Sequence, residues 1–278
     1  MTQASPNVSL NGSRLIRFLS DLAVSDVEVS HKQFTEKLGQ LISFSDAITL
    51  SAVHSKLSKM ACEPTEATSE SVRVEFLRVR EVLVKSIIMS FTFSTRPSTI
   101  PLPIPKADTP RDKAVSYEPY QRFYARHQRE IDFKVQSLQL YVRDGVSGLS
   151  LELAQLVALD AALGDVLAVH TRRLFAVIPK LLSKRFEYLK KEHQQALANL
   201  EDNDTSGSND PFVDNQAEWI KPGGWLHTFY QEMQGLLLAE LDVRLQPILG
   251  LVETLNEQLE TDNEKLEALN EQVEEIDD

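Results

Sequence analysis

The stretch WLHTFYQEMQGLLLAELDVRLQPI, residues 225–248, decides the fold class of this 278-residue chain. Its apolar residues recur at every fourth position, which places them on one face of an α-helix. The recurring set is Phe229, Met233, Leu237, Leu241 and Leu245. This pattern predicts an amphipathic helix with one face packed against a core.

Residues 151–197 form a second long helical pattern that would supply the packing partner. Its apolar stripe contains Leu156, Leu159, Leu163, Leu167, His170, Leu174, Val177, Leu181 and Leu189. We expect this stripe to be the buried face, with His170 as a core histidine and Pro179 as a kink. Because the polar segment 201–215 joins the two patterns, they predict an antiparallel helical hairpin.

The rest of the chain is also typical of helices. Only ten glycines and twelve prolines occur, too few for the turns of a β-sandwich, a barrel or a doubly wound sheet. Helix starts are expected at Ser13, Ser30, Ser45 and Ser116, and Gly145 and Gly148 are expected to end the helix that follows Ser116. The predicted class is all-α: a small N-terminal helical bundle and a long hairpin that ends in an acidic coiled-coil tail.

The order of these patterns predicts a division of the chain into five parts. Five prolines between Pro97 and Pro110 mark the clearest boundary, because they exclude helix and favour an extended spacer. The parts are a disordered tail (1–12), an N-terminal helical module (13–95), a proline-rich linker (96–115), the long-helix hairpin (116–250) and the acidic coiled-coil tail (251–278).

Cysteine content and apolar run lengths indicate the compartment. Cys62 is the single cysteine, so neither an intramolecular disulfide nor a multi-cysteine zinc site can form. The first residues show neither the basic region nor the apolar run of a secretory signal. Apolar runs such as 236–239 are much shorter than the roughly 20 residues that span a bilayer. We expect a cytoplasmic protein without direct membrane insertion.

The C-terminal residues repeat every seven positions, as LNEQLET, DNEKLEA and LNEQVEE. Apolar residues fill nine of the ten seam positions between 245 and 276, which is typical of a coiled coil. The candidate interaction residues are Leu255, Leu259, Asp262, Leu266, Leu269, Val273 and Ile276. Asp262 would face its own copy in a parallel homodimer, so a partner offering Lys or Arg is favoured over a symmetric dimer. A solvated acidic tail is the alternative.

Charge is distributed unevenly along the chain. Residues 253–278 hold eleven acidic residues against Lys265, whereas the whole chain has a net charge of -12. A basic face on the 151–197 helix contrasts with this tail and consists of Arg172, Arg173, Lys180, Lys184, Arg185, Lys190 and Lys191. This face would be a solvated surface or a dock for acidic helices, including this tail; nucleic-acid phosphates are a less favoured ligand because no stacking aromatic platform accompanies it.

Sequence motifs for catalysis are not found. There is no glycine-rich phosphate loop and no GxSxG elbow, and we expect no catalytic, cofactor-binding or metal-binding residues. His127 and Glu130 share a helix face with Arg126, which predicts a surface ion-pair network there.

Three blocks of the sequence resemble a known family. They are RFLSDLAVSD with FTEKLGQLISFSDAITLSAV, then LVALDAALGDVLAVHTRRLFAVIPKLLSKRFEYL, then FYQEMQGLLLAELDVRLQPILGLVETL. Together they resemble an uncharacterised proteobacterial domain-of-unknown-function family, DUF 3348. The resemblance implies a cytoplasmic bacterial helical protein, and an association with genes for envelope proteins that carry stator-like or peptidoglycan-binding domains. It implies no catalytic residues.

Two functions follow from these patterns. The first is a non-enzymatic helical scaffold or adaptor that engages a protein partner through its coiled coil and helical surfaces, in connection with a bacterial envelope complex. The alternative is a nucleic-acid-associated regulator that uses the basic helix face and is restrained by its acidic tail.

Overall fold

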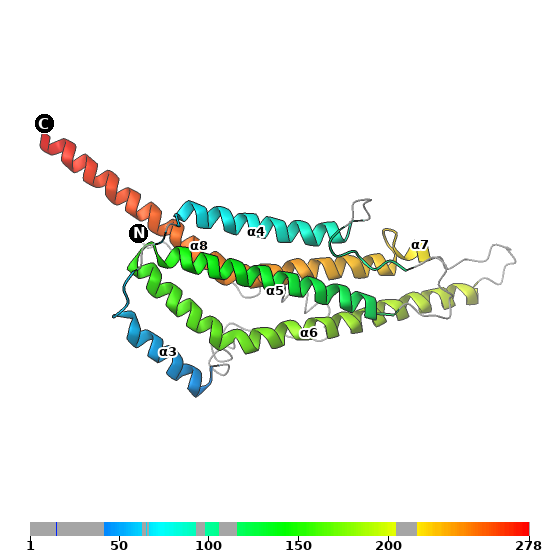
Figure 1. The fold of residues 1–278 in the computed structure, drawn as a ribbon. Coiled ribbons are helices and arrows are strands. Elements are labelled where there is room, and N and C mark those ends of the chain that lie inside the picture. The colour runs from blue at the N-terminus through cyan, green and yellow to red at the C-terminus, as the bar shows by residue number, and fades with distance from the viewer. Residues whose placement is uncertain are drawn as a thin grey trace. The chain divides into compact units, whose positions relative to one another are not determined.

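The computed structural model describes residues 15, 42–62, 65, 67–92, 98–105, 116–203 and 216–277, and gives side chains within these ranges except at 200–203, 216–217 and 262–277. The described residues contain helices and no strand (Figure 1), which confirms the all-α class. The helices are α3 (Phe44–Leu57), α4 (Ser69–Ser90), α5 (Glu118–Ser147), α6 (Leu151–Asn203), α7 (Gln216–Trp219) and α8 (Trp225–Asp277). The predicted tail 1–12 and the helices expected from Ser13 and Ser30 lie outside the described residues, apart from Leu15, which is helical and buried.

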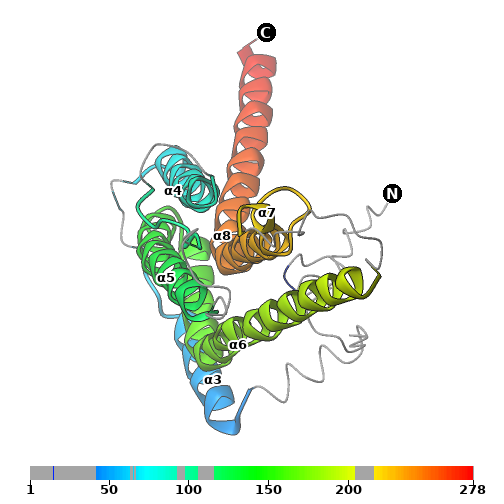
Figure 2. The same ribbon diagram turned by 90° about the vertical axis from the view of Figure 1, so that its right-hand side faces the viewer.

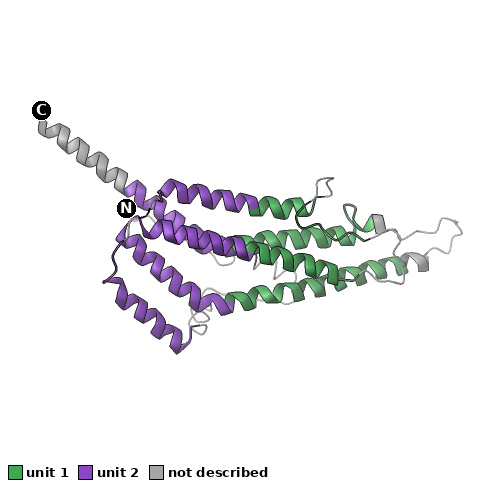
Figure 3. Cartoon of the chain, viewed as in Figure 1, with its two compact units in different colours: residues 1–34, 83–131, 171–243 green, residues 35–82, 132–170, 244–278 purple. Residues whose placement is uncertain are grey.

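The chain forms two compact units, each assembled from three separated segments (Figure 3). Unit 1 comprises residues 1–34, 83–131 and 171–243, and unit 2 comprises residues 35–82, 132–170 and 244–278. Consequently α4, α5, α6 and α8 each contribute residues to both units. The two longest helices, α6 and α8, are each continuous (Figure 1, Figure 2) although each contains one proline, Pro179 or Pro247.

Aromatic rings from α5, α6 and α8 form the core of unit 1. Phe186 of α6 packs edge-on against Phe229 of α8 at 5.2 Å between ring centroids, and Tyr120 of α5 lies 5.5 Å from Phe186. Three contacts join α6 to α8: His193 with Trp225, Phe186 with Phe229 and Arg185 with Glu232. From the first pair to the last, the residue number decreases in α6 and increases in α8. These segments are therefore antiparallel within unit 1. The α8 stripe predicted from sequence is buried at all five positions.

Unit 2 is held by close backbone approach and by polar contacts between its helices. Gly145 of α5 is buried, and a Cβ atom there would come within 2.7 Å of the Val72 side chain of α4. Arg143 of α5 bonds Asp160 of α6 at 2.6 Å, and Arg244 of α8 bonds Asp132 of α5 at 2.6 Å. Gln258 of α8 also donates to the Ser150 hydroxyl at 3.2 Å.

Two local signals were misassigned from sequence. Gly148 directly follows the last residue of α5, Ser147, as expected, whereas Gly145 lies inside the helix and gives room to the Val72 side chain of α4. Ser43, not Ser45, caps α3 through a capping box in which Asp46 accepts from the Ser43 backbone N–H at 2.9 Å. Both errors concern what a small residue contacts, which spacing alone does not reveal.

The described part of the proline-rich segment, residues 98–105, contains no helix or strand. It nonetheless packs on unit 1, where Ile100 and Leu102 are buried. The Tyr230 hydroxyl donates to the Pro103 carbonyl at 2.9 Å. This part of the segment is therefore attached to the core of unit 1 instead of spanning solvent as a spacer would.

Candidate interaction surfaces

A buried polar cluster lies in unit 1 around Glu240, a fully buried residue of α8. The Tyr124 hydroxyl donates to Glu240 Oε2 at 2.9 Å, and Gln128 Nε2 donates to the same oxygen at 3.0 Å. A buried acidic group is tolerated only when donors of this kind replace water. The cluster thus fixes α5 against α8.

Pro179 is built into the same core. It has no N–H, so the carbonyl of Phe175 loses its usual helical donor. Gln128 donates to that carbonyl at 3.2 Å, and the Tyr117 hydroxyl donates to the carbonyl of Pro179 at 2.8 Å. Gln128 of α5 therefore replaces the donor that the proline lacks, and Tyr117 adds a second bond at the same turn of α6.

Burial raises the pKa of the phenols of Tyr117, Tyr120 and Tyr230 above the ordinary value for tyrosine. All three hydroxyls are therefore protonated at neutral pH and act as hydrogen-bond donors. The Tyr230 hydroxyl donates its proton to the Pro103 carbonyl. Across the 3.3 Å between the Tyr120 and Tyr230 hydroxyls, Tyr120 is therefore the donor. The phenols are thereby committed to structural contacts.

His127 of α5 is buried, which corrects the prediction of a surface ion-pair network with Glu130. Its Nε2 atom has no hydrogen-bond partner, and its ring packs edge-on against Phe123 with 4.8 Å between centroids. Burial lowers the pKa of His127 to about 4, although Glu130 opposes the shift; Arg126 adds slightly to it. The imidazole is consequently neutral in the folded protein at physiological pH.

This depressed pKa predicts a loss of stability in mild acid. An unfolded histidine gains its proton near pH 6.5, whereas the folded one gains it only near pH 4, so the contribution of His127 is complete above pH 6.5 and decreases as the pH falls toward 4. At pH 5 the loss amounts to about 2 kcal/mol. We expect His127→Leu to remove this part of the pH dependence in urea unfolding at pH 7.5 and pH 5. The exposed His54→Leu serves as the control, and an equal pH dependence in the His127 variant would refute the assignment.

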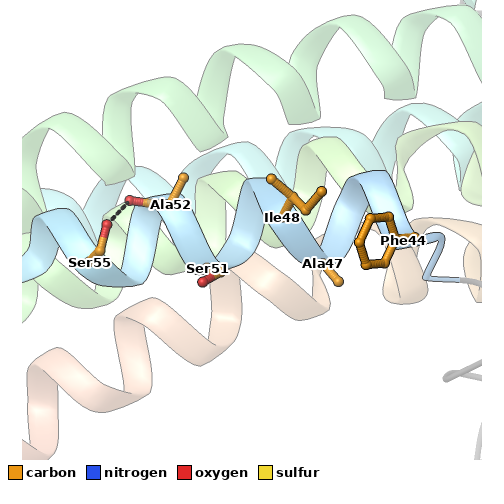
Figure 4. Close-up of a pocket in the computed structure, with 6 residues that line it drawn as sticks. All are labelled: Phe44, Ala47, Ile48, Ser51, Ala52 and Ser55. Carbon is orange, nitrogen blue, oxygen red and sulfur yellow. Dashed lines mark hydrogen bonds between the residues drawn. The ribbon is translucent and has the colours of Figure 1, made fainter.

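Among the side chains that the structure describes, no group of three or more His, Cys, Asp or Glu is placed to hold a metal ion. A shallow groove of about 450 Å³ runs along one face of α3 in unit 2 (Figure 4). Its lining is Phe44, Ala47, Ile48, Ser51, Ala52 and Ser55. Because this lining consists of small and apolar side chains of one helix, the groove brings no acid, base or nucleophilic pair together.

The basic face predicted on α6 separates into two groups. Arg172, Arg173, Lys180, Lys184 and Lys191 are exposed, whereas Arg185 and Lys190 are half-buried. Arg185 is committed to the core of unit 1, since its guanidinium bonds the Glu232 carboxylate at 2.6 Å and lies over the Tyr188 ring at 5.3 Å. Arg185 is therefore a structural residue of the α6–α8 contact.

In unit 1 the apolar stripe predicted as the buried face of α6 is correct at Leu189 and wrong before it. The buried residues there are Phe175, Ile178, Leu182, Phe186 and Leu189. Leu174, Val177 and Leu181 of the predicted stripe each precede a buried residue by one position, about 100° around the helix. Leu174 and Val177 are 46% and 47% exposed, and Leu181 and His170 are half-buried. Thus α6 has two apolar faces, and the described residues cover only one of them.

We name the uncovered face the α6 outer seam. It consists of Leu174, Val177, Leu181, Lys184, Tyr188 and Lys191. Their spacing alternates between three and four residues, which is the spacing of a coiled-coil seam. Tyr188 is 52% exposed. An exposed seam of this kind is typical of a surface that receives another helix.

The first residues of the coiled-coil seam in the C-terminal tail pass from a buried to an exposed environment. Val252 and Leu255 are buried in unit 2, whereas Leu259 is 41% exposed. The helix itself continues to Asp277. Asp262, Leu266, Leu269, Val273 and Ile276 lie outside the residues whose side chains are described. Leu255 is therefore a core residue, and the candidate interaction seam starts at Leu259.

Within the described residues, one helix is long and apolar enough to cross a membrane by length and composition, namely residues 151–199 of α6. Only 17% of its most apolar 18-residue window is buried.

Comparison with known proteins places the chain in a family. The sequence pattern of the family described as "Protein of unknown function (DUF3348)" matches residues 1–257. No curated protein and no solved structure matches the chain. The end of the tail, from Gln258 onward, lies beyond the matched residues. Since the match covers nearly the whole chain, the protein belongs to the DUF3348 family.

Proposed function

We propose that this protein is a non-enzymatic helical scaffold or adaptor that engages a protein partner through its coiled-coil tail and its helical surfaces. The observation that supports this most is the α6 outer seam. Leu174, Val177 and Tyr188 are each about half exposed in an arrangement with coiled-coil spacing. Exposed apolar side chains in such a row gain free energy when a second helix covers them.

The distribution of polar groups supports the same function. Tyr124 and Gln128 both donate to Glu240 inside unit 1, and Arg185 is paired with Glu232. These groups bond one helix to another. The surface of α6 instead offers apolar side chains and cations, which suit recognition of an acidic amphipathic helix.

A nucleic-acid-associated regulator is the second candidate. It is favoured by the exposed cations of α6, of which Arg173, Lys180 and Lys184 are examples. Apolar residues alternate with these cations along α6. Phosphate binding relies on the cations and does not account for the exposed apolar residues. A gel-shift titration at low salt, with and without residues 262–278, tests this candidate: flat titrations for both chains would eliminate it.

We propose a cytoplasmic location and a link to a bacterial envelope complex. The support for both is what the resemblance to the DUF 3348 family implies. The apolar part of α6 is consistent with burial by protein, because Asp160 within it is paired with Arg143.

Affinity purification from the native host tests the scaffold function. The full chain is compared with a chain stopped after Thr261, which keeps the buried Val252 and Leu255 and the bond from Gln258 to Ser150. We expect at least one host protein that co-purifies in stoichiometric amount with the full chain to be lost, or reduced about tenfold, without the tail.

A surface variant provides the second arm of this test. Val177→Glu places a charge on the α6 outer seam, and Val74→Glu is the matched control on α4, since the two valines are 47% and 50% exposed. The first change is expected to reduce recovery of the partner, and the second to preserve it. Identical sets of co-purified proteins for all four chains would contradict the scaffold function.

A further inference from the structure

We propose that two copies of this chain associate reciprocally, with the tail of each copy, from Leu259 to Ile276, packed on the other copy's α6 outer seam from Leu181 onward. This inference rests on the proposed function and identifies one partner for its helical surface. It is carried by the spacing, the burial and the charges of the two seams.

The α6 outer seam is suited to a single helix. In a heptad frame its residues alternate between the two core positions: Leu174, Leu181 and Tyr188 at the first, Val177, Lys184 and Lys191 at the second. The exposed cations Arg173 and Lys180 flank the first position. Two copies of this seam would bring Lys184 against Lys184, so self-pairing of α6 is disfavoured by like charge.

The tail also has a charged residue at a core position, but of the opposite sign. Its seam residues Leu259, Leu266 and Val273 occupy the first core position, and Asp262, Leu269 and Ile276 the second. A parallel pair of tails would bring Asp262 against Asp262 in an apolar layer, which costs free energy or requires a proton. Each seam therefore opposes pairing with itself.

Pairing one seam with the other removes both defects. In a parallel arrangement, equivalent core positions face each other. The register that sets Lys184 opposite Asp262 also sets Leu181 opposite Leu259 and Tyr188 opposite Leu266. In this register the tail covers the α6 outer seam from Leu181 onward, whereas Leu174 and Val177 lie before the first tail residue. One charged layer of opposite sign then lies between two apolar layers, as in coiled coils whose partner choice is set by a single polar core position.

Net charge favours the same pairing. Between residues 172 and 191 the chain carries seven basic residues and one acidic residue, Glu187. The tail carries eleven acidic residues and Lys265 between residues 253 and 278. Most of the acids occupy outer heptad positions, where they attract the basic helix without being buried.

The course of α8 indicates that the tail packed on α6 belongs to a second copy of the chain. The first part of α8 already packs on the core face of α6 through Phe229 and Glu232. From there α8 continues as one helix to Asp277, so a return to α6 of the same chain would break it. The contact begins at Leu259 because Leu255 is buried in its own unit 2. Reciprocal exchange of two tails gives a closed dimer.

Sedimentation velocity of the purified full chain over a concentration series tests this inference. We expect a monomer–dimer equilibrium that is lost when the chain stops after Thr261. Lys184→Glu and Asp262→Lys should each weaken dimerisation about tenfold or more, because each places like charges in one layer. The double variant restores opposite charges and should return the dissociation constant to within about threefold of the original. Lys56→Glu, an exposed change on α3, is the charge-matched control and should have no effect.

Three outcomes would overturn the inference: a monomer at every concentration, single variants that dimerise like the original chain, or a double variant that fails to recover. The affinity purification described above separates this failure from that of the scaffold function. If the isolated chain is monomeric but loses a host protein with its tail, the scaffold function stands and the reciprocal dimer is wrong. Circular dichroism of each variant verifies that the helices are intact.

Discussion

Replacement of Phe229 by alanine is expected to lower the free energy of unfolding by about 4 kcal/mol, the largest effect of any single substitution considered for this protein. Phe229 is fully buried, and its ring lies 5.2 Å from Phe186 and 5.7 Å from Tyr120. Removing the ring leaves a cavity between α5, α6 and α8, which these neighbours can fill only in part. Urea unfolding followed by circular dichroism measures the change.

The matched control for this change is Phe133→Ala. Phe133 is 72% exposed on α5, so the same loss of a phenyl ring should change the free energy of unfolding by less than about 0.5 kcal/mol. If the two variants were equally stable, the packing assigned to the aromatic core of unit 1 would be incorrect.

Replacement of Glu240 by alanine is expected to cost about 3 kcal/mol. The change leaves the Tyr124 hydroxyl and one Gln128 N–H without their acceptor in a buried site. Gln128 also donates to the carbonyl that Pro179 leaves without its usual donor, so the part of α6 around Pro179 should be affected as well. Hydrogen exchange of the amides near Phe175 would report this local effect.

Glu240→Gln is the discriminating variant for the buried polar cluster. Glutamine keeps the size of the side chain and one acceptor oxygen, so it should cost clearly less than alanine, about 1 kcal/mol. If alanine and glutamine destabilised equally, the hydrogen bonds to Glu240 would not be the source of its contribution.

The sequence predicts a buried face well where every apolar face of a helix is covered. In α8 the predicted stripe from Phe229 to Leu245 is buried at every position, and so are Leu226, Tyr230 and Leu236 beside it. In α6 two neighbouring faces are apolar, and periodicity cannot tell which of them is covered. The stripe containing Leu174 and Val177 was therefore assigned to the core although these residues are exposed.

The buried polar residues were harder to identify. Glu240 interrupts an apolar run between Ala239 and Leu241, and this interruption was the available signal that its carboxyl group is buried. His127 was assigned to a surface network because Arg126 and Glu130 lie nearby in sequence, yet its own face of α5 points into unit 1. Such assignments depend on contacts between distant segments, for example Gln128 with Glu240, which a single sequence does not contain.

The misassigned stripe is also the most informative feature for function. Apolar side chains with coiled-coil spacing would normally be covered, and α6 leaves Leu174, Val177 and Tyr188 about half exposed. The burial of the first tail residues determines where the tail can be removed without disturbing unit 2. A chain stopped after Leu251 would lose Val252 and Leu255 from the core of unit 2, whereas a chain stopped after Thr261 retains both.

The most direct test of the scaffold account is a photo-crosslinking amino acid at position 188 of the α6 outer seam, activated in cells of the native host. The account predicts a crosslinked protein adduct in the full chain and its loss when the chain stops after Thr261. Mass spectrometry of the adduct then distinguishes a second copy of this chain from another protein. If position 188 forms no adduct with any protein, the α6 outer seam is not a binding surface and the scaffold account is contradicted.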